Sequence, residues 1–190
     1  MGPRRLHGDE DGSGYKRVGS VLYFTGDVGN ELHVFLASNL GPGLAKPATR
    51  LVLNSPGGDE YCCYSIVDLL EGIGGIPILS TGYCMSAAVP IVAAGEKGKR
   101  FATPRTRFMI HAGWTQYERP VDRKFMECEK DEMDYLEDLY AQILAKHTGY
   151  KTAKWWRDVG ERDSRWYFSA EEALKMGLID GIQEFNRHGV

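Results

Sequence analysis

The sequence predicts an α/β protein built from repeated βαβ units. Short apolar runs that are typical of buried strands alternate along the chain with stretches of helical period. Several of these runs are continuously apolar, which indicates strands buried on both faces. Because parallel strands are joined by crossovers that are usually helices, this alternation indicates parallel βαβ units. We expect one domain over residues 19–190, preceded by a polar, Gly-rich and flexible arm at residues 1–18.

The first half of the chain alternates strands with helices. The predicted strands are a β-rich run and two buried apolar runs, at 20–26, 49–58 and 76–82. The predicted helices have apolar residues at helical spacing or small apolar residues throughout, and they cover 31–43, 60–73 and 82–95. A Gly-Pro-Gly sequence ends the first of these helices, since neither residue type continues a helix well.

The second half contains three more short strands and two helices. The predicted strands lie at 99–104, 107–113 and 178–185, and the predicted helices at 121–149 and 169–177. The last helix should begin at a capping box, because Ser169 is followed three residues later by Glu172. Gly177 should end it.

The long helix at 121–149 has an apolar stripe on one face and carboxylates on the other. The stripe consists of Met133, Leu136, Tyr140, Ile143 and Leu144. A helix of this length has no obvious place on one compact domain, so we expect it to protrude. We expect its apolar stripe to contact another subunit.

Composition excludes several classes of protein. The net charge of -3 and the scattered basic residues argue against nucleic-acid binding. No apolar run is long enough to span a membrane, and the N-terminus lacks an apolar secretory signal, so we expect a cytoplasmic protein. The four cysteines show no metal-ligand spacing and are interpreted as free thiols, with a disulfide or zinc framework as the alternative.

Three features could carry chemistry. In "NSPGGD" (54–59), the glycines after a buried strand could aim a backbone amide at a developing oxyanion, or could form only a structural turn. Ser86 precedes small residues where a helix is predicted to begin, and could be a nucleophile or a helix cap. His111 ends an apolar strand, where active-site residues of α/β sheets gather, although it could be structural.

Taken together, these motifs resemble the ClpP family of serine peptidases. The segments "LVLNSPGG", "GYCMSAAVPIVAAGEKGKRFATPRTRFMIH", "HTG" and "FSAEEALKMGLIDGI" occur in the family's order across residues 20–183. The resemblance implies the ClpP/crotonase fold of βαβ units, with the long helix as a protruding handle that joins two rings. Pro90, three tryptophans near the expected acid and an altered spacing before Ser169 suggest a divergent member.

The resemblance also implies the roles of individual residues. A count without gaps places the nucleophile at Ser86 and the general base at His111, while Cys84 falls where the family usually has a small residue. The oxyanion-hole amides fall on Gly58 and Ala87. The implied reaction is acyl transfer through an acyl-enzyme, with no cofactor and no metal.

The third member of the implied triad is ambiguous. Asp163 ends an "ERD" that matches the family pattern, but it lies about two residues further than usual from Ser169. Asp158, in the preceding "RD", is the alternative. We favour Asp163.

The resemblance implies partners as well. They are polypeptide substrates, further copies of the chain in heptameric rings joined through the handle helix, and an AAA+ unfoldase, since the sequence has no P-loop of its own. The alternatives are a non-catalytic ring subunit and a ClpP-like phage head maturation protease. A crotonase-type acyl-CoA enzyme shares the fold but does not call for the serine and histidine pair, and ranks last.

Overall fold

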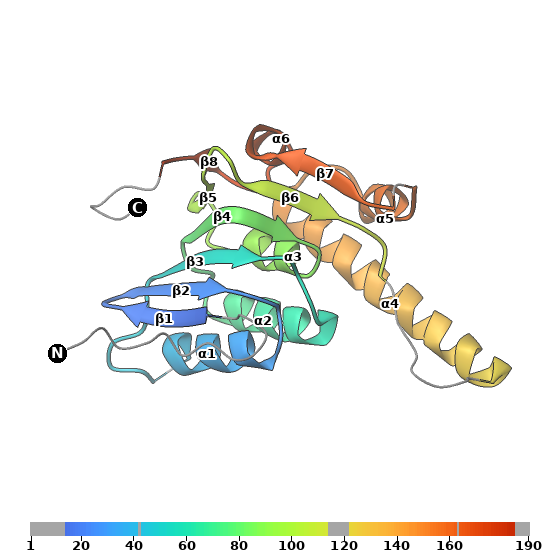
Figure 1. Ribbon diagram of the computed structural model, residues 1–190, viewed down its shortest axis with the longest axis horizontal. Helices are drawn as coiled ribbons and strands as arrows, with labels where there is room; N and C mark the ends of the chain where they lie inside the picture. Colours follow the sequence, from blue (N-terminus) through green and yellow to red (C-terminus); the bar gives the residue numbers. More distant parts are fainter. Residues whose placement is uncertain (1–13, 42, 114–121, 163, 185–190) are drawn as a thin grey trace.

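One mixed sheet runs through the computed structural model, which describes residues 14–41, 43–113, 122–162 and 164–184 (Figure 1). The strands in this part of the chain are β1 (Gly14–Val18), β2 (Val21–Thr25), β3 (Arg50–Ser55), β4 (Ile78–Met85), β5 (Arg100–Ala102), β6 (Arg107–Ile110), β7 (Trp166–Ser169) and β8 (Gly181–Ile182). Their order is β1-β2-β3-β4-β5-β8, and β6 and β7 branch from β4.

The centre of the sheet is parallel, as the sequence predicts. Strands β2, β3, β4, β5 and β8 pair in parallel, whereas β1 and β7 are antiparallel to their neighbours. Strand β4 has two partners beyond β3. Its first residues pair with β5, and Tyr83–Met85 pair in parallel with β6. The α/β fold with parallel βαβ units is confirmed.

The described helices are α1 (Asn30–Leu40), α2 (Glu60–Gly72), α3 (Ala88–Ala93), α4 (Arg123–Thr148), α5 (Ala153–Arg162) and α6 (Ala170–Lys175). Helix α6 begins at the predicted capping box, with both hydrogen bonds between Ser169 and Glu172 present. Helices α1 and α2 pack together below the first strands (Figure 1). Apolar side chains from both fill one core with those of the parallel strands, for example Leu22, Leu36, Leu53, Ile66 and Ile78. None of the described helices is long and apolar enough to cross a membrane.

Several expectations from the sequence need correction. The flexible arm expected at 1–18 is wrong for residues 14–18, which form β1 because a turn at Gly19 (φ 62°) lets them pair with β2; residues 1–13 lie outside the described part. The helix expected at 82–95 is a strand up to Met85, since pairing with β6 extends β4. The strand expected at 178–185 shrinks to β8.

Helix α5 was not predicted from the sequence. Trp155 and Trp156 of this helix pack edge-on against one another, and Trp155 also packs against Trp166 of β7. The indole N–H of Trp156 donates to the carbonyl of Tyr150 at 2.8 Å. This aromatic cluster holds α5 against the start of β7. The helix is therefore stabilised by tertiary packing more than by a helical pattern in its own sequence.

The apolar stripe of α4 packs mainly against its own subunit. Leu136 and Leu144 are buried, and Tyr140 and Ile143 pack partly buried against the same core. The expectation that the whole stripe faces another subunit is therefore wrong for these residues. The exposed apolar side chains of α4 lie nearer its N-terminus, at Phe125, Met126 and Tyr135. That end projects away from the sheet (Figure 1).

A buried ion pair joins the sheet to the helices around it. The side chain of Arg100 is 1% exposed, and its guanidinium binds both carboxylate oxygens of Asp180 at 2.6–2.8 Å. A third guanidinium nitrogen donates to the carbonyls of Ala93 and His147, at the ends of α3 and α4. The pair therefore holds the loop before β8 and the ends of two helices to β5.

Replacing Asp180 by alanine should destabilise the protein strongly, because the Arg100 guanidinium would stay buried without its carboxylate. We expect a loss of about 3–5 kcal/mol in the free energy of unfolding. Urea denaturation followed by circular dichroism measures it. Arg123→Ala breaks the exposed Arg123–Glu127 pair and serves as the control, with little expected effect. Equal losses in the two variants would contradict the structural role of Arg100.

Candidate active site

Ser86 lies at the junction between β4 and α3, in a backbone conformation that is rare for serine. Its φ is 50°, in the left-handed region. Its N–H donates to the carbonyl of Met109 in β6 at 2.8 Å, and its own carbonyl accepts from the Val89 N–H at 2.9 Å and the Tyr140 hydroxyl at 3.1 Å. Strained conformations of this kind persist where the surroundings hold them, and they cluster at functional sites.

Pro90, which comes four residues after Ser86, fits this geometry. It is the third residue of α3, which begins at Ala88. The first amides of a helix have no intrahelical carbonyl to bind, so a proline there sacrifices no helical hydrogen bond. Pro90 is compatible with a serine placed just before the helix.

The two glycines of "PGG" approach neighbouring segments so closely that only glycine fits, Gly57 at the Ser86 turn and Gly58 at Val28. A Cβ on Gly57 (φ 102°) would lie 2.6 Å from the Cβ of Ser86, and a Cβ on Gly58 (φ 147°) would lie 2.3 Å from the carbonyl oxygen of Val28. The Val28 N–H donates to the Gly57 carbonyl, and the Val28 carbonyl accepts from the Asp59 N–H. In a parallel bridge of this kind, the N–H of the residue between them, Gly58, points away from Val28. Within the described residues, neither the Gly58 nor the Ala87 amide donates to another protein group.

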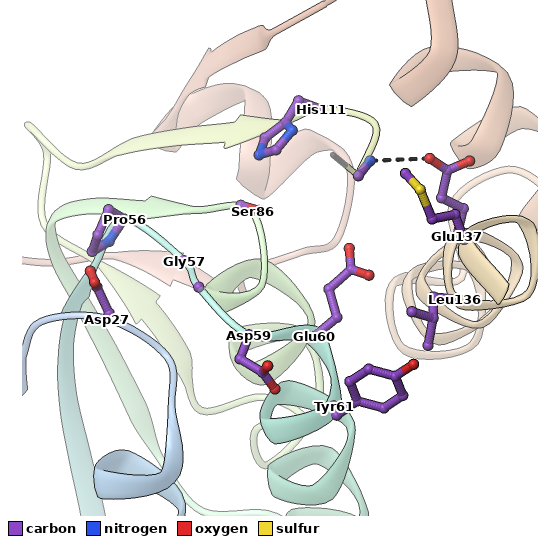
Figure 2. Close-up of a pocket in the computed structure, with 13 residues that line it drawn as sticks. Asp27, Pro56, Gly57, Asp59, Glu60, Tyr61, Ser86, His111, Leu136 and Glu137 are labelled. Atoms are coloured by element: carbon purple, nitrogen blue, oxygen red, sulfur yellow. Dashed lines mark hydrogen bonds between the residues drawn. The ribbon is translucent and has the colours of Figure 1, made fainter. Parts of the chain in front are cut away.

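His111 follows β6 directly, and one of its ring nitrogens makes a hydrogen bond. Its Nδ1 lies 2.5 Å from the carbonyl oxygen of Ala112. Because a carbonyl can only accept, Nδ1 carries a proton and donates to Ala112, and Nε2 is the ring nitrogen that this hydrogen bond does not use. In Figure 2 the His111 ring lies on the same side of the cavity as Ser86. A neutral imidazole with a free Nε2 is the form that can act as a base.

Ser86 and His111 line one cavity of about 510 Å³ between the sheet, α2 and α4 (Figure 2). Other residues that line it are Asp27, Pro56, Gly57, Gly58, Asp59, Glu60, Tyr61, Gly113, Met133, Leu136 and Glu137. The cavity thus brings together a hydroxyl, an imidazole and the glycine turn, groups suited to acyl transfer. Ala87 follows Ser86 directly in the chain.

Four carboxylates that line this cavity were not predicted as site residues, and Glu60 and Glu137 are the two whose pKa is raised. Glu60 points from the start of α2 toward the middle of the cavity, and Glu137 enters from α4 (Figure 2). Burial raises the pKa of both, and repulsion by Glu137 and Asp59 raises the pKa of Glu60 further. Glu137 accepts from the Gly113 N–H at 3.1 Å and contacts Arg157 at 3.2 Å. Glu60 could have been suspected because it comes two residues after "PGG", but Glu137 is one of many acidic residues on α4.

Of the two aspartates predicted as the third catalytic group, one, Asp158, lies in the described part of the chain. Asp158 is paired with Lys154 at 2.8 Å on the surface, and it lines neither of the two cavities that His111 lines. Asp163 lies outside the described residues. Strand β7 pairs antiparallel with β6, and its first residue, Trp166, pairs with Ile110, the residue before His111.

Cys84, the other nucleophile considered near this turn, is fully buried in the core. Burial raises the pKa of its thiol, so it does not form the reactive thiolate. All four cysteines are free, as the sequence predicts. Among the described residues, no group of three or more potential ligands is arranged to hold a metal ion.

Comparison with known proteins points in one direction. The family model of Clp protease matches residues 45–186. The ATP-dependent Clp protease proteolytic subunit of Deinococcus radiodurans is 35% identical over 139 residues, which cover 73% of this chain and 66% of that protein. The protein of the same name from Porphyromonas gingivalis is 35% identical over 144 residues, covering 72% of this chain and 60% of that protein. The chain therefore spans about two thirds or less of the length of these relatives.

Replacing Glu60 by glutamine should stabilise the protein at neutral pH. The raised pKa means that the folded protein binds this proton more tightly than the unfolded chain does. Stability is therefore lost as the pH rises from about 4.3, the ordinary pKa of glutamate, through the raised pKa. We expect Glu60→Gln to raise the melting temperature at pH 7 by roughly 1–3 °C.

The gain should shrink toward pH 4, where Glu60 is protonated in the wild-type protein. Calorimetry at both pH values measures the difference. Asp68 is an exposed carboxylate on the same helix, so Asp68→Asn is the matched control and should change stability less. A gain that is the same at both pH values would argue against a raised pKa of Glu60.

Proposed function

Because the chain belongs to the Clp protease family, we propose that it acts as a serine-type endopeptidase subunit that cleaves unfolded polypeptides. One observation supports this above the others: Ser86, in its left-handed turn, lines the same cavity as His111. Two further features agree with acyl transfer. The Nε2 atom of His111 is free to take a proton, and the Gly58 and Ala87 amides have no acceptor within the described residues.

In the proposed reaction, Nε2 of His111 removes the proton from the Ser86 hydroxyl as its oxygen attacks the carbonyl carbon of a peptide bond. The amides of Gly58 and Ala87 hold the resulting oxyanion. The histidine then gives its proton to the leaving amine, and the C–N bond breaks to leave an ester on Ser86. A water molecule, deprotonated by the same histidine, hydrolyses the ester and restores the free serine.

We propose that Asp163 takes over the hydrogen bond that Nδ1 of His111 makes with the Ala112 carbonyl in this structure, and so orients the imidazole. Its position in the sequence shortly before β7 supports this choice, since β7 pairs with the strand that His111 follows. Asp158 is a weaker candidate because it pairs with Lys154 at the surface. An orienting carboxylate raises the rate by holding the imidazole in one tautomer, and it matters less than the nucleophile itself.

We propose that the protein works in the cytoplasm as part of a larger assembly. We propose heptameric rings that pair through α4, whose projecting N-terminal end carries exposed Phe125, Met126 and Tyr135. Phe125 and Met126 are neighbours in the chain, and adjoining exposed apolar side chains are typical of a protein–protein contact. An AAA+ unfoldase would deliver the unfolded chains, because the sequence has no P-loop.

The nucleophile can be tested by covalent labelling. A fluorophosphonate probe should label the assembled protein, and Ser86→Ala should abolish the labelling because the attacking oxygen is gone. Cys84→Ala should keep it, which makes this variant the matched control two residues away. Intact-protein mass spectrometry measures the added mass. Absence of labelling in the assembled wild-type protein would instead favour a non-catalytic ring subunit.

The orienting carboxylate can be tested by comparing two conservative variants. Asp163→Asn should lower kcat for a fluorogenic peptide by about 10²–10⁴-fold, because the imidazole loses its charged partner. Asp158→Asn should leave kcat within about twofold, since it removes only an exposed pair. Steady-state kinetics of both purified variants decide between them. The reverse pattern would assign the role to Asp158.

A further inference from the structure

One face of α4 is tied to the rest of the molecule by tyrosine hydroxyls at three successive turns. Tyr61 of α2 donates to the carboxylate of Glu132 at 2.8 Å. One turn later, Tyr64 of α2 donates to the backbone carbonyl of Leu136 at 2.6 Å. One turn further, Tyr140 of α4 donates in the opposite direction, to the backbone carbonyl of Ser86 at 3.1 Å. The spacing of four residues puts these contacts on a single helix face.

The third of these contacts touches the turn that carries the proposed nucleophile. Tyr140 packs against the core and lines the smaller cavity of about 20 Å³ that Ser86 and His111 also line. Burial raises the pKa of its phenol, so the hydroxyl keeps its proton. A protonated phenol facing a carbonyl can only donate, which fixes the direction of this hydrogen bond.

The carbonyl that Tyr140 binds shares a peptide group with the proposed oxyanion amide. The C=O of Ser86 and the N–H of Ala87 lie in one rigid plane and point in opposite directions. A donor on the carbonyl therefore restricts the direction of the N–H. It also polarises the peptide group, which makes the N–H a stronger donor. The Val89 N–H binds the same carbonyl from the helix side, so the plane is held at two points.

We propose that Tyr140 is a positioning residue, whose hydroxyl holds the peptide group between Ser86 and Ala87 so that the Ala87 amide faces the oxyanion. This inference rests on the proposed function, because it assigns the amide its task there. Tyr140 itself does not touch the substrate. The strained φ of Ser86 is the reason that such support is needed, since the turn would otherwise relax toward a more common conformation.

The test compares two substitutions that each remove one hydroxyl from the full-length protein. Tyr140→Phe deletes the bond to Ser86, and Tyr64→Phe deletes the similar bond to the Leu136 carbonyl without touching the turn. Both keep the aromatic ring. For a fluorogenic peptide, Tyr140→Phe should lower kcat roughly tenfold with KM unchanged, because the oxyanion forms only in the transition state. Tyr64→Phe should change kcat by less than about twofold.

A second measurement does not depend on catalysis. Amide hydrogen exchange over residues 84–89 should become faster in Tyr140→Phe and stay unchanged in Tyr64→Phe, if the hydroxyl holds this turn. Thermal unfolding of both variants confirms that they fold. Equal losses of kcat in the two variants, or unchanged exchange over 84–89 in Tyr140→Phe, would overturn the inference. Should the wild-type protein cleave nothing, the proposed function fails by itself, and the exchange result still decides whether Tyr140 holds the turn.

Discussion

The parallel pairing of the end of β4 with β6 is the interaction on which the candidate site depends. Strand β4 pairs first with β5 and then, from Tyr83 onward, with β6. The change of partner occurs where the side chain of Asn54 accepts from the Tyr83 N–H and the register with β3 shifts. The same pairing continues into the hydrogen bond from Ser86 N–H to Met109 O. Ser86 and His111 are neighbours because each comes just after the end of one of these two strands.

The glycine turn depends on this arrangement in the same way. Gly57 fits against Ser86 only because it has no side chain, and the bridge between Val28 and Gly58 holds the turn at the edge of the cavity. The serine, the histidine and the glycine turn thus come from the ends of parallel or paired strands, where α/β proteins gather their active sites.

Helix α4 contributes to the site as well as to the outline of the molecule. Its C-terminal half is buried against the core, with Leu136 and Leu144 inside, while Glu137 enters the cavity and Tyr140 binds the Ser86 carbonyl. Its N-terminal half projects from the sheet (Figure 1). Any contact made by the projecting end would therefore be made by the same helix whose Tyr140 binds the Ser86 carbonyl.

The sequence alone determined the α/β class, the parallel units, the capping box at Ser169 and the family, because apolar periodicity and short motifs are local properties of the chain. It also singled out Ser86 and His111, and the family resemblance, rather than any local pattern, implied that the two act together. Tertiary structure alone decided the strand at 82–85, helix α5 and the presence of Glu60, Glu137 and Tyr140 around the site. These depend on contacts between residues far apart in the chain, such as the pairing of β4 with β6 and the approach of α4 to Ser86, and such contacts leave no mark in local periodicity.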